Sequence, residues 1–201
     1  FISSVSHELR TPLTSIKGWS ETLGLDNISK EELSMGLGII NDETERLIKL
    51  VEELLDFSRM SSNRMKLNIA EVNIENLVSS VINQLRSMAI KKNIRLSFEF
   101  LNQDMTIIYG DKDRLRQVLI NLVQNSLKFT PEEGVISVKV DQTSNETSIC
   151  VADNGIGIDE KNIANVSKKF FQQDFHKSGS GLGLAISEEI VKLHGGFLTI
   201  N

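Results

Sequence analysis

The sequence has little cysteine and few aromatic residues, and each shortage excludes a class of protein. Its single cysteine, Cys150, excludes an internal disulfide framework and a cysteine-rich zinc site. Aromatic residues make up 5% of the 201 residues, which favours packing by Leu, Ile and Val in helical bundles over an aromatic-rich β-sandwich. No run of about 18 apolar residues is present, so no membrane-spanning helix is predicted within the chain.

Positive charge is also in short supply. Lys and Arg together number 22 against 27 Asp and Glu, which gives a formal net charge of −5. A broad basic field that holds DNA or RNA is therefore not expected, and we predict no nucleic-acid partner. The 40% of hydrophobic residues is ordinary for a chain that buries a core, and the length allows one or two domains.

Apolar residues recur at spacings of three and four through the first sixty residues, which predicts two amphipathic helices. Ser29-Lys30-Glu31-Glu32 matches a capping box that begins the second helix. Two helices joined by a short connection form an antiparallel hairpin, which cannot bury both apolar stripes alone. We therefore expect a homodimer in which two hairpins form a four-helix bundle. The stripes comprise Ile2, Val5, Leu9, Pro12, Ile16, Trp19 and Leu23, then Leu33, Leu37, Ile40, Thr44, Leu47, Val51, Leu54 and Ser58.

The rest of the chain mixes helical and strand patterns, which predicts a second domain of α+β type, a two-layer sandwich of helices and sheet. We assign residues 1–60 to the helical domain, 61–70 to a linker and 71–201 to the sandwich. Asn73 and Asp111 are the predicted N-caps of two of its helices. The predicted strands span 94–100, 135–140 and 147–152, and the predicted helices span 74–90, 112–128 and 182–194.

Both ends of the chain fall inside a predicted element. The chain opens within a helical pattern at Phe1-Ile2 and stops at Leu198-Thr199-Ile200-Asn201 as if within a strand. We therefore expect a fragment whose second domain is truncated at the C-terminus.

His7 is the first candidate for chemistry, in Ser6-His7-Glu8-Leu9-Arg10-Thr11-Pro12. It stands two residues, about 200° of helix rotation, from both Val5 and Leu9, so it points away from the buried stripe. An outward histidine is often only a solvated side chain. Pro12, however, interrupts a strong helical pattern and frees the Glu8 carbonyl. Glu8 can hold the imidazole in the tautomer that leaves one ring nitrogen nucleophilic.

Asn121, Asn125 and Lys128 fall at i, i+4 and i+7 of a predicted helix and share one face. Two amide oxygens there can help hold Mg²⁺, which needs few protein oxygens when phosphates and waters supply the rest. Lys128 offers a positive charge to a phosphate. The same pattern also fits a polar, solvated helix face.

Two glycine-containing segments follow. Asp153-Asn154-Gly155-Ile156-Gly157 ends a predicted strand, where a carboxylate can accept a hydrogen bond from the amino group of adenine and glycines let a ligand approach the backbone. A simple Asp-Asn-Gly turn is the alternative. Gly179-Ser180-Gly181-Leu182-Gly183 leads into a helix, and a Gly-rich helix N-terminus makes an anion site. The spacing matches neither a dinucleotide-binding motif nor a Walker loop, and a glycine cluster alone is a weak signal.

Between these segments, residues 160–178 are predicted to form a mobile lid over the nucleotide. The lid carries cationic and aromatic side chains, namely Lys168, Lys169, Phe170, Phe171 and His176.

Together the four segments resemble the sequence boxes of sensor histidine kinases. Residues 6–12 are similar to the phosphoacceptor box, 121–128 to the asparagine box, and 153–157 and 179–183 to the two glycine boxes. They occur in the family's order and cover nearly the whole chain. The ATP-binding half is also similar to that of gyrase, Hsp90 and MutL ATPases, which lack the His7 helix.

The resemblance implies roles for three residues of the first helix. His7 would be the phosphoacceptor and Glu8 its acid-base partner. Thr11 matches the position that orients water when such proteins dephosphorylate their response regulator. The implied function is ATP-dependent autophosphorylation on His7, then phosphotransfer to an aspartate of a response regulator, together with phosphatase activity towards that regulator.

The resemblance also implies a nucleotide site for ATP and Mg²⁺. Asn125, with help from Asn121, would hold Mg²⁺, and Lys128 would contact a phosphate. Phe129 would pack near the base and Asp153 would fix adenine. The backbone positions carried over with them are Gly155, Gly157, Gly179, Gly181, Leu182 and Gly183.

The lid departs from the family pattern because it contains no arginine. The cation near the γ-phosphate would then be Lys168, Lys169, Lys177 or His176, or would come from outside the lid. The resemblance further implies a cytoplasmic portion of a parent protein, and any membrane anchor of that parent would lie in upstream segments. A dimeric docking module without kinase activity and a hydrolytic ATPase of the gyrase and Hsp90 type stay open as alternatives, and acid-labile phosphate on the protein would exclude both.

Overall fold

The computed structural model describes residues 2–25, 27–61, 65–101, 107–143, 146–163, 165–166, 168, 171 and 181–201. The chain divides into two compact units. One comprises residues 1–65 with 168–182, and the other comprises 66–167 with 183–201. We call them the helical unit and the α/β unit.

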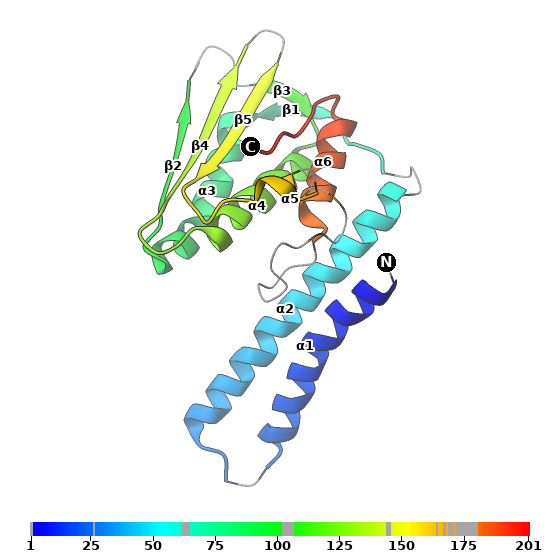
Figure 1. Cartoon of the computed structure of the whole chain (residues 1–201), viewed down its shortest axis with the longest axis vertical. Coiled ribbons are helices and arrows are strands. Elements are labelled where there is room, and N and C mark those ends of the chain that lie inside the picture. Colours follow the sequence, from blue (N-terminus) through cyan, green and yellow to red (C-terminus); the bar gives the residue numbers. More distant parts are fainter. Residues whose placement is uncertain are drawn as a thin grey trace. The chain divides into compact units, whose positions relative to one another are not determined.

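The helical unit is built on a hairpin of two helices, α1 (Ile2–Leu23) and α2 (Lys30–Ser61) (Figure 1). The predicted capping box at its turn is confirmed. The Glu32 amide donates to Ser29 Oγ at 3.1 Å, and Glu32 Oε2 accepts from the Ser29 amide at 3.0 Å and the Ser29 hydroxyl at 2.8 Å. These hydrogen bonds lower the pKa of Glu32.

The hairpin buries few large side chains. Leu50 is the one large hydrophobic residue among its described side chains that is fully buried, at 7% exposure. The two helices pack closely at Gly36, where an added Cβ would lie 2.7 Å from the Trp19 ring and 2.9 Å from Leu23. Apolar side chains remain exposed along α2, including Leu33, Leu37, Ile48, Val51 and Leu55.

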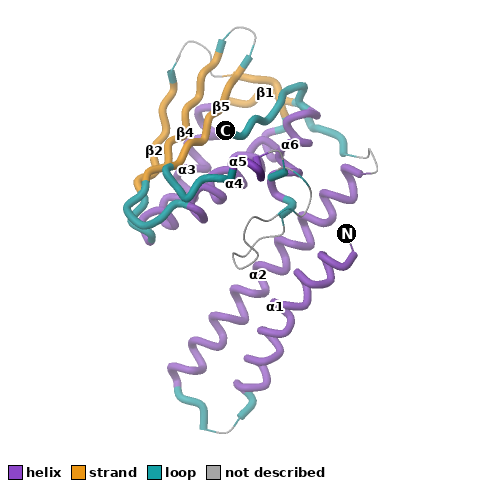
Figure 2. The backbone as a smooth tube through the Cα atoms, in the orientation of Figure 1, coloured by secondary structure: helices purple, strands orange, loops and turns teal. Residues whose placement is uncertain are grey.

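The α/β unit contains two small sheets (Figure 2). Strands β1 (Ala70–Asn73) and β3 (Ile107–Gly110) pair antiparallel. Strands β2 (Arg95–Phe100), β4 (Val135–Gln142) and β5 (Thr147–Asp153) form a mixed sheet in the order β2-β4-β5, in which β2 runs parallel and β5 antiparallel to β4.

Helices cover one face of the mixed sheet, which gives a two-layer arrangement. Helices α3 (Ile74–Lys91) and α4 (Lys112–Phe129) pack on the sheet, and α6 (Gly183–Leu193) packs on α4. A short helix, α5 (Glu160–Ile163), follows β5. Alternate β4 residues point into the core because side chains alternate along a strand. The core comprises Val72, Ile74, Leu77, Val78, Val81, Ile82, Leu85, Ala89, Ile94, Leu119, Val123, Leu127, Ile136, Val138 and Val140.

Both predicted N-caps of this unit are confirmed. Asn73 Oδ1 accepts from the Asn76 amide at 2.8 Å, and Asp111 Oδ1 accepts from the Asp113 and Arg114 amides at 3.1 Å. Asp111 Oδ2 also accepts from the Asn68 amide at 2.8 Å. Burial alone would raise the pKa of Asp111, but these three amides and the Arg114 charge together lower it.

The structure differs from the sequence prediction in two respects. The strand expected at 198–201 is wrong, because that segment pairs with no described strand and a strand exists only through pairing. Strands β1 and β3 and helix α5 were not predicted. Strand β1 begins at Ala70, the last residue of the predicted linker. Four residues, the length of β1 and of β3, is the shortest run over which alternation identifies a strand.

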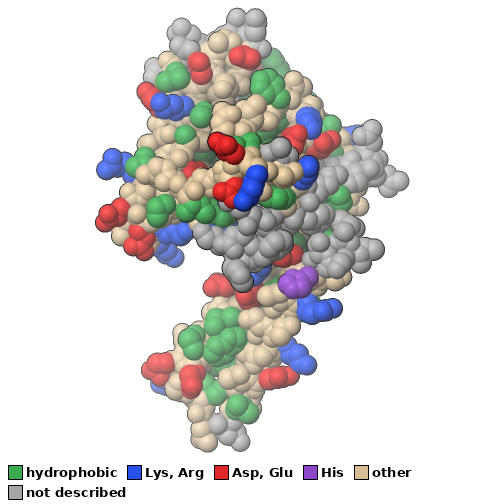
Figure 3. Space-filling model, viewed as in Figure 1, with side chains coloured by type: hydrophobic (Ala, Val, Ile, Leu, Met, Phe, Trp, Pro, Cys, Tyr) green, Lys and Arg blue, Asp and Glu red, His purple; other side chains and the backbone are tan. Residues whose placement is uncertain are grey.

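The predicted lid is described at 160–163, 165–166, 168 and 171 only. Lys169, Phe170, His176 and Lys177 lie outside the described residues. In the described part of the chain, no helix combines the length and apolarity needed to cross a membrane. On the face drawn in Figure 3, acidic and basic side chains are interspersed.

Candidate functional site

His7, Glu8 and Thr11 lie on one stretch of α1 in the helical unit. His7 is exposed, as its distance from the apolar stripe predicted, and Pro12 is buried within the same helix. The Thr11 hydroxyl donates to the His7 carbonyl at 3.3 Å. The imidazole therefore faces solvent from a helix in which Pro12 has no amide hydrogen to give to Glu8.

Glu8 is held from the second helix by Arg46. Arg46 Nη2 lies 3.6 Å from Glu8 Oε2, and Arg46 Nη1 lies 3.6 Å from Glu43 Oε2. Glu43 Oε2 is buried and accepts no hydrogen bond from the described residues, so the Arg46 charge compensates it. Sequence reasoning missed Arg46, because a charged residue on a polar helix face gives no signal of its partner on another helix.

Asn121, Asn125 and Lys128 lie along one face of α4, as predicted, and all three are half-buried. No hydrogen bond joins the Asn125 side chain to another described residue, so its amide is available to a ligand. Lys128 Nζ lies 4.7 Å from the centroid of the Phe129 ring, a cation–π contact.

Asn121 is fixed by α6. Its Nδ2 donates to the Ser187 hydroxyl at 2.9 Å, and Ser187 is 1% exposed. A Cβ at Gly183, the first residue of α6, would collide with Asn121 Oδ1. The start of α6 thus lies against the asparagine face of α4, and a side chain at position 183 would require Asn121 to move.

Asp153 ends β5 and is exposed, but both of its carboxylate oxygens are held by the protein. Oδ2 accepts from the Ser126 hydroxyl at 2.7 Å, and Oδ1 accepts from the Gly155 amide at 2.9 Å. Ser126 lies on α4 and is 6% exposed. Each carboxylate oxygen keeps capacity for a further donor, such as the amino group of a base.

At Gly155 the loop after β5 packs closely against the C-terminal end of α4. A Cβ there would lie 2.8 Å from both Asp153 Oδ1 and the Phe129 carbonyl. The Ile156 amide donates to the same Phe129 carbonyl at 3.3 Å. The structure therefore brings the predicted residues Asp153, Gly155 and Phe129 together.

Two further glycines of the predicted site have a left-handed backbone conformation. Gly157 and Gly181 have φ of +69° and +68°, a left-handed conformation that favours glycine. Leu182 is fully buried immediately before α6, and Gly179 lies outside the described residues. The first amides of α6 have no partner within the helix, as at any helix N-terminus, and can therefore bind an anion.

The donor set of the α/β unit fits Mg²⁺ bound together with phosphates. Among the described residues, no group of three or more His, Cys, Asp or Glu is placed to hold a metal. The Asn125 amide is available, whereas Asn121 has its nitrogen engaged by Ser187 and its oxygen against Gly183. A single amide oxygen suits Mg²⁺, which keeps several waters and takes oxygens from phosphates.

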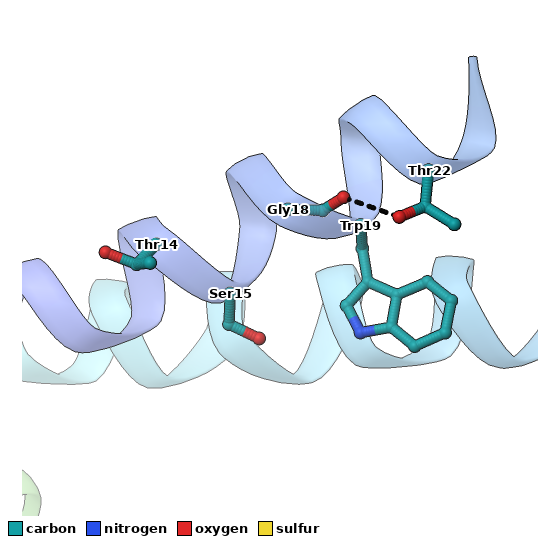
Figure 4. Close-up of a pocket in the computed structure, with 5 residues that line it drawn as sticks. All are labelled: Thr14, Ser15, Gly18, Trp19 and Thr22. Carbon is teal, nitrogen blue, oxygen red and sulfur yellow. Dashed lines mark hydrogen bonds between the residues drawn. The ribbon is translucent and has the colours of Figure 1, made fainter. Parts of the chain in front are cut away.

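A shallow depression of about 280 Å³ lies on the surface of α1 (Figure 4). Thr14, Ser15, Gly18, Trp19 and Thr22 line it, and the Thr22 hydroxyl donates to the Gly18 carbonyl at 2.9 Å. It contains no ionisable side chain, so nothing in its lining suits the triphosphate of a nucleotide.

Comparison with known families assigns each unit separately. Residues 1–63 match a family model described as the His Kinase A phospho-acceptor domain. Residues 110–201 match one described as a histidine kinase-, DNA gyrase B- and HSP90-like ATPase. The first match contains His7, and the second contains Asn125, Asp153 and α6.

The similar proteins are histidine kinases. Sensor histidine kinase YclK of Bacillus subtilis is 33% identical over 205 residues, which cover 100% of this chain and 43% of YclK. Histidine kinase ThkA in complex with response regulator protein TrrA has a TM-score of 0.76 at 29% identity, covering 97% of this chain and 55% of that one. Full-length ShkA in complex with AMPPNP has a TM-score of 0.72 at 30% identity, covering 96% and 40%. This chain spans less than half the length of the curated relatives it matches first.

Proposed function

The chain belongs to the sensor histidine kinases of two-component systems, and on that premise we propose that it transfers the γ-phosphate of ATP to His7 and then to an aspartate of a response regulator. One observation carries the proposal. A single chain matches both the phospho-acceptor and the ATPase family models, and each match contains the residues that the corresponding step requires. We assign 1–60 to dimerisation and phosphotransfer, 61–70 to a linker and 71–201 to ATP binding.

ATP would bind the α/β unit at the site formed by α4, the end of β5 and the start of α6. Asp153 would accept a hydrogen bond from the adenine amino group, with Phe129 packed near the base. The start of α6 and Lys128 would neutralise the phosphates. ShkA, which has a similar structure, was solved with AMPPNP, and this supports a nucleotide at the corresponding place.

Asn125 would hold Mg²⁺, with Asn121 as the weaker candidate because its amide is already engaged. When bound, Mg²⁺ neutralises charge on the phosphate oxygens. The protein's own contribution is to position the phosphates and to keep the Asn125 amide available.

The transfer step needs an unprotonated nitrogen on His7. That nitrogen attacks the γ-phosphorus, the bond between the γ-phosphorus and the bridging oxygen breaks, and ADP leaves with the electron pair. Glu8, held by Arg46, would keep the other ring nitrogen oriented and accept its proton.

The phosphohistidine would then donate to an aspartate of a response regulator. ThkA, whose fold this chain shares, was solved with the response regulator TrrA. Thr11, one turn beyond His7, would orient water in the reverse reaction, dephosphorylation of the regulator. Because ATP is a nucleotide of the cell interior, we place this portion of the protein in the cytoplasm.

A homodimer through the hairpin completes the proposal. Leu33, Leu37, Ile48, Val51 and Leu55 are 44–54% exposed and fall within about 60° of one another around α2. A second hairpin packed on this stripe would form a four-helix bundle and remove it from water.

Labelling of the chain by γ-labelled ATP and Mg²⁺, beside a His7→Gln variant, tests the proposal. We expect acid-labile label on the wild type alone. Label of equal strength on the variant would place the acceptor elsewhere. Steady ATP hydrolysis without labelling of the protein would favour a hydrolytic ATPase. ATP binding without hydrolysis and without labelling would favour a docking module.

A further inference from the structure

The ATP-binding site contains a buried hydroxyl that the steps above do not use. Ser126 lies on α4 between Asn125 and Leu127 and is 6% exposed. Its Oγ donates to Asp153 Oδ2 at 2.7 Å, across 27 residues of sequence. A hydrogen bond this short to a carboxylate is typical of the charge-assisted kind, which is stronger than a neutral one.

The bond matters because of what it does to an exposed carboxylate. Asp153 is open to solvent, so on its own its carboxylate would rotate and exchange hydrogen bonds with water. Ser126 fixes Oδ2 from the helix side, and the Gly155 amide fixes Oδ1 at 2.9 Å from the loop side. With one donor on each oxygen, the plane of the carboxylate is set before a ligand arrives.

We propose that Ser126 is a positioning residue that holds Asp153 for the adenine amino group, and that it thereby sets the preference of this site for adenine over guanine. The inference deepens the proposed function and rests on it. An ionised carboxylate only accepts hydrogen bonds. Adenine presents an amino donor at position 6, whereas guanine presents an acceptor oxygen there. A fixed carboxylate therefore accepts a hydrogen bond from the adenine amino group and repels the guanine oxygen. A freely rotating, hydrated carboxylate discriminates less between the two bases.

Ser126→Ala removes the hydroxyl and leaves the side chain small enough for the site. Because Asp153 is exposed, water will replace part of the lost bond. We expect the Kd for ATP to rise about fivefold. The Kd for GTP should change less than about twofold, since no favourable contact with guanine is lost. The ratio of the two Kd values falls accordingly.

The measurement is binding of ATP and GTP to the whole chain by isothermal titration, with the melting temperature of each variant measured alongside. Ser126→Cys, which keeps the volume and weakens the donor, should fall between the wild type and Ser126→Ala. It also preserves the test if the alanine variant folds poorly.

Two matched variants separate positioning from general loosening. Ser187→Ala removes a buried hydroxyl that contacts Asn121 and not Asp153, so it should change the ATP and GTP affinities by the same factor. Ser80→Ala removes a hydroxyl on α3 that donates to the Leu77 carbonyl at 2.8 Å and accepts from Arg116 Nη1 at 2.8 Å. It should lower the melting temperature without changing the ATP-to-GTP ratio.

Each outcome decides the point. A fall in ATP-over-GTP preference confined to the Ser126 variants supports the inference. If the wild type binds ATP selectively, two results would contradict the role of Ser126. One is an unchanged ATP-over-GTP preference in Ser126→Ala. The other is an equal loss of affinity for ATP and GTP together with a lower melting temperature. A wild type that binds ATP no better than GTP overturns the proposed adenine site itself, and this inference with it.

Discussion

The two units of the chain bury their hydrophobic residues to very different extents. The α/β unit has a continuous core drawn from β1, α3, α4 and β4, with several side chains at 0–1% exposure. The described part of the hairpin has one fully buried large hydrophobic residue, Leu50. Both units are regular in secondary structure, so regularity alone says little about what stabilises each of them.

This difference in burial indicates what stabilises each unit. The α/β unit satisfies its apolar residues within one chain. The hairpin leaves an apolar stripe on α2 in water, at a cost of roughly 25 cal/mol for each Å² that a partner would cover. We therefore expect the stability of the hairpin to depend on protein concentration and that of the α/β unit to be independent of it.

Leu77→Ala should have the largest effect. Leu77 is 1% exposed in the core of the α/β unit, so its truncation leaves a cavity and should cost about 3 kcal/mol of unfolding free energy. Urea unfolding at two protein concentrations measures it. We expect the same loss at both concentrations, and a loss that grows on dilution would mean that this core, too, depends on a partner.

Val51→Glu should dissociate the homodimer. Val51 is 47% exposed in the single chain, so a charge there is nearly neutral for the monomer but is buried in the proposed bundle. We expect the dimer dissociation constant to rise about a hundredfold, or about 2.7 kcal/mol, by analytical ultracentrifugation. Ile90→Glu, at a 66% exposed apolar site on α3, is the matched control and should leave association unchanged. If Val51→Glu and Ile90→Glu raised the dimer dissociation constant equally, the exposed stripe of α2 would not be the dimer interface.

Local sequence signals were sufficient to predict most of the fold. Period-3.6 patterns located α1–α4 and α6 to within a few residues, and Ser29, Asn73 and Asp111 marked helix starts because a cap is a contact between near neighbours. Strands β1 and β3 were not predicted, because each is only four residues long. Each is also a strand only through its pairing with the other, 37 residues away.

The site was predictable to the extent that it follows from helix geometry. Spacing placed Asn121, Asn125 and Lys128 on one face of α4. The partners that fix them were not predictable, because Ser187 comes 66 residues after Asn121 and Ser126 meets Asp153 only once β5 has packed. Tertiary packing brings these pairs together, and no local pattern encodes them.

Two glycines of α2 test how closely the hairpin helices pack within one chain. A Cβ at Gly36 would strike the Trp19 ring, whereas a Cβ at Gly38 would meet nothing within 4 Å. Gly38→Ala should stabilise the hairpin by about 1 kcal/mol through helix propensity. Gly36→Ala gains the same propensity but overpacks the contact with α1, and we expect a net loss of about 1 kcal/mol. Thermal unfolding at fixed concentration compares them, and equal shifts would mean that the helices are not in close contact at Gly36.

Asp111→Asn tests a single capping carboxylate of the α/β unit, and its effect should be no larger than those of the glycine variants. The asparagine can still cap α4 through one oxygen, but its amino group would face the Asn68 amide, so we expect a loss of about 1 kcal/mol at pH 7.

The pH dependence of that loss follows from the lowered pKa of Asp111. The ionised carboxylate is stabilised in the folded chain relative to an unfolded Asp with a pKa of about 3.9. Its contribution is therefore complete above about pH 5 and is lost as the pH falls through the folded pKa. The wild type should converge on Asp111→Asn as urea unfolding is repeated from pH 6 towards pH 3. Both chains keep the hydrogen bond from the residue 111 amide to His194 Nε2, at 2.9 Å in the wild type. A gap that stays constant to pH 3 would show that the Asn68 contact does not depend on the charge of the carboxylate.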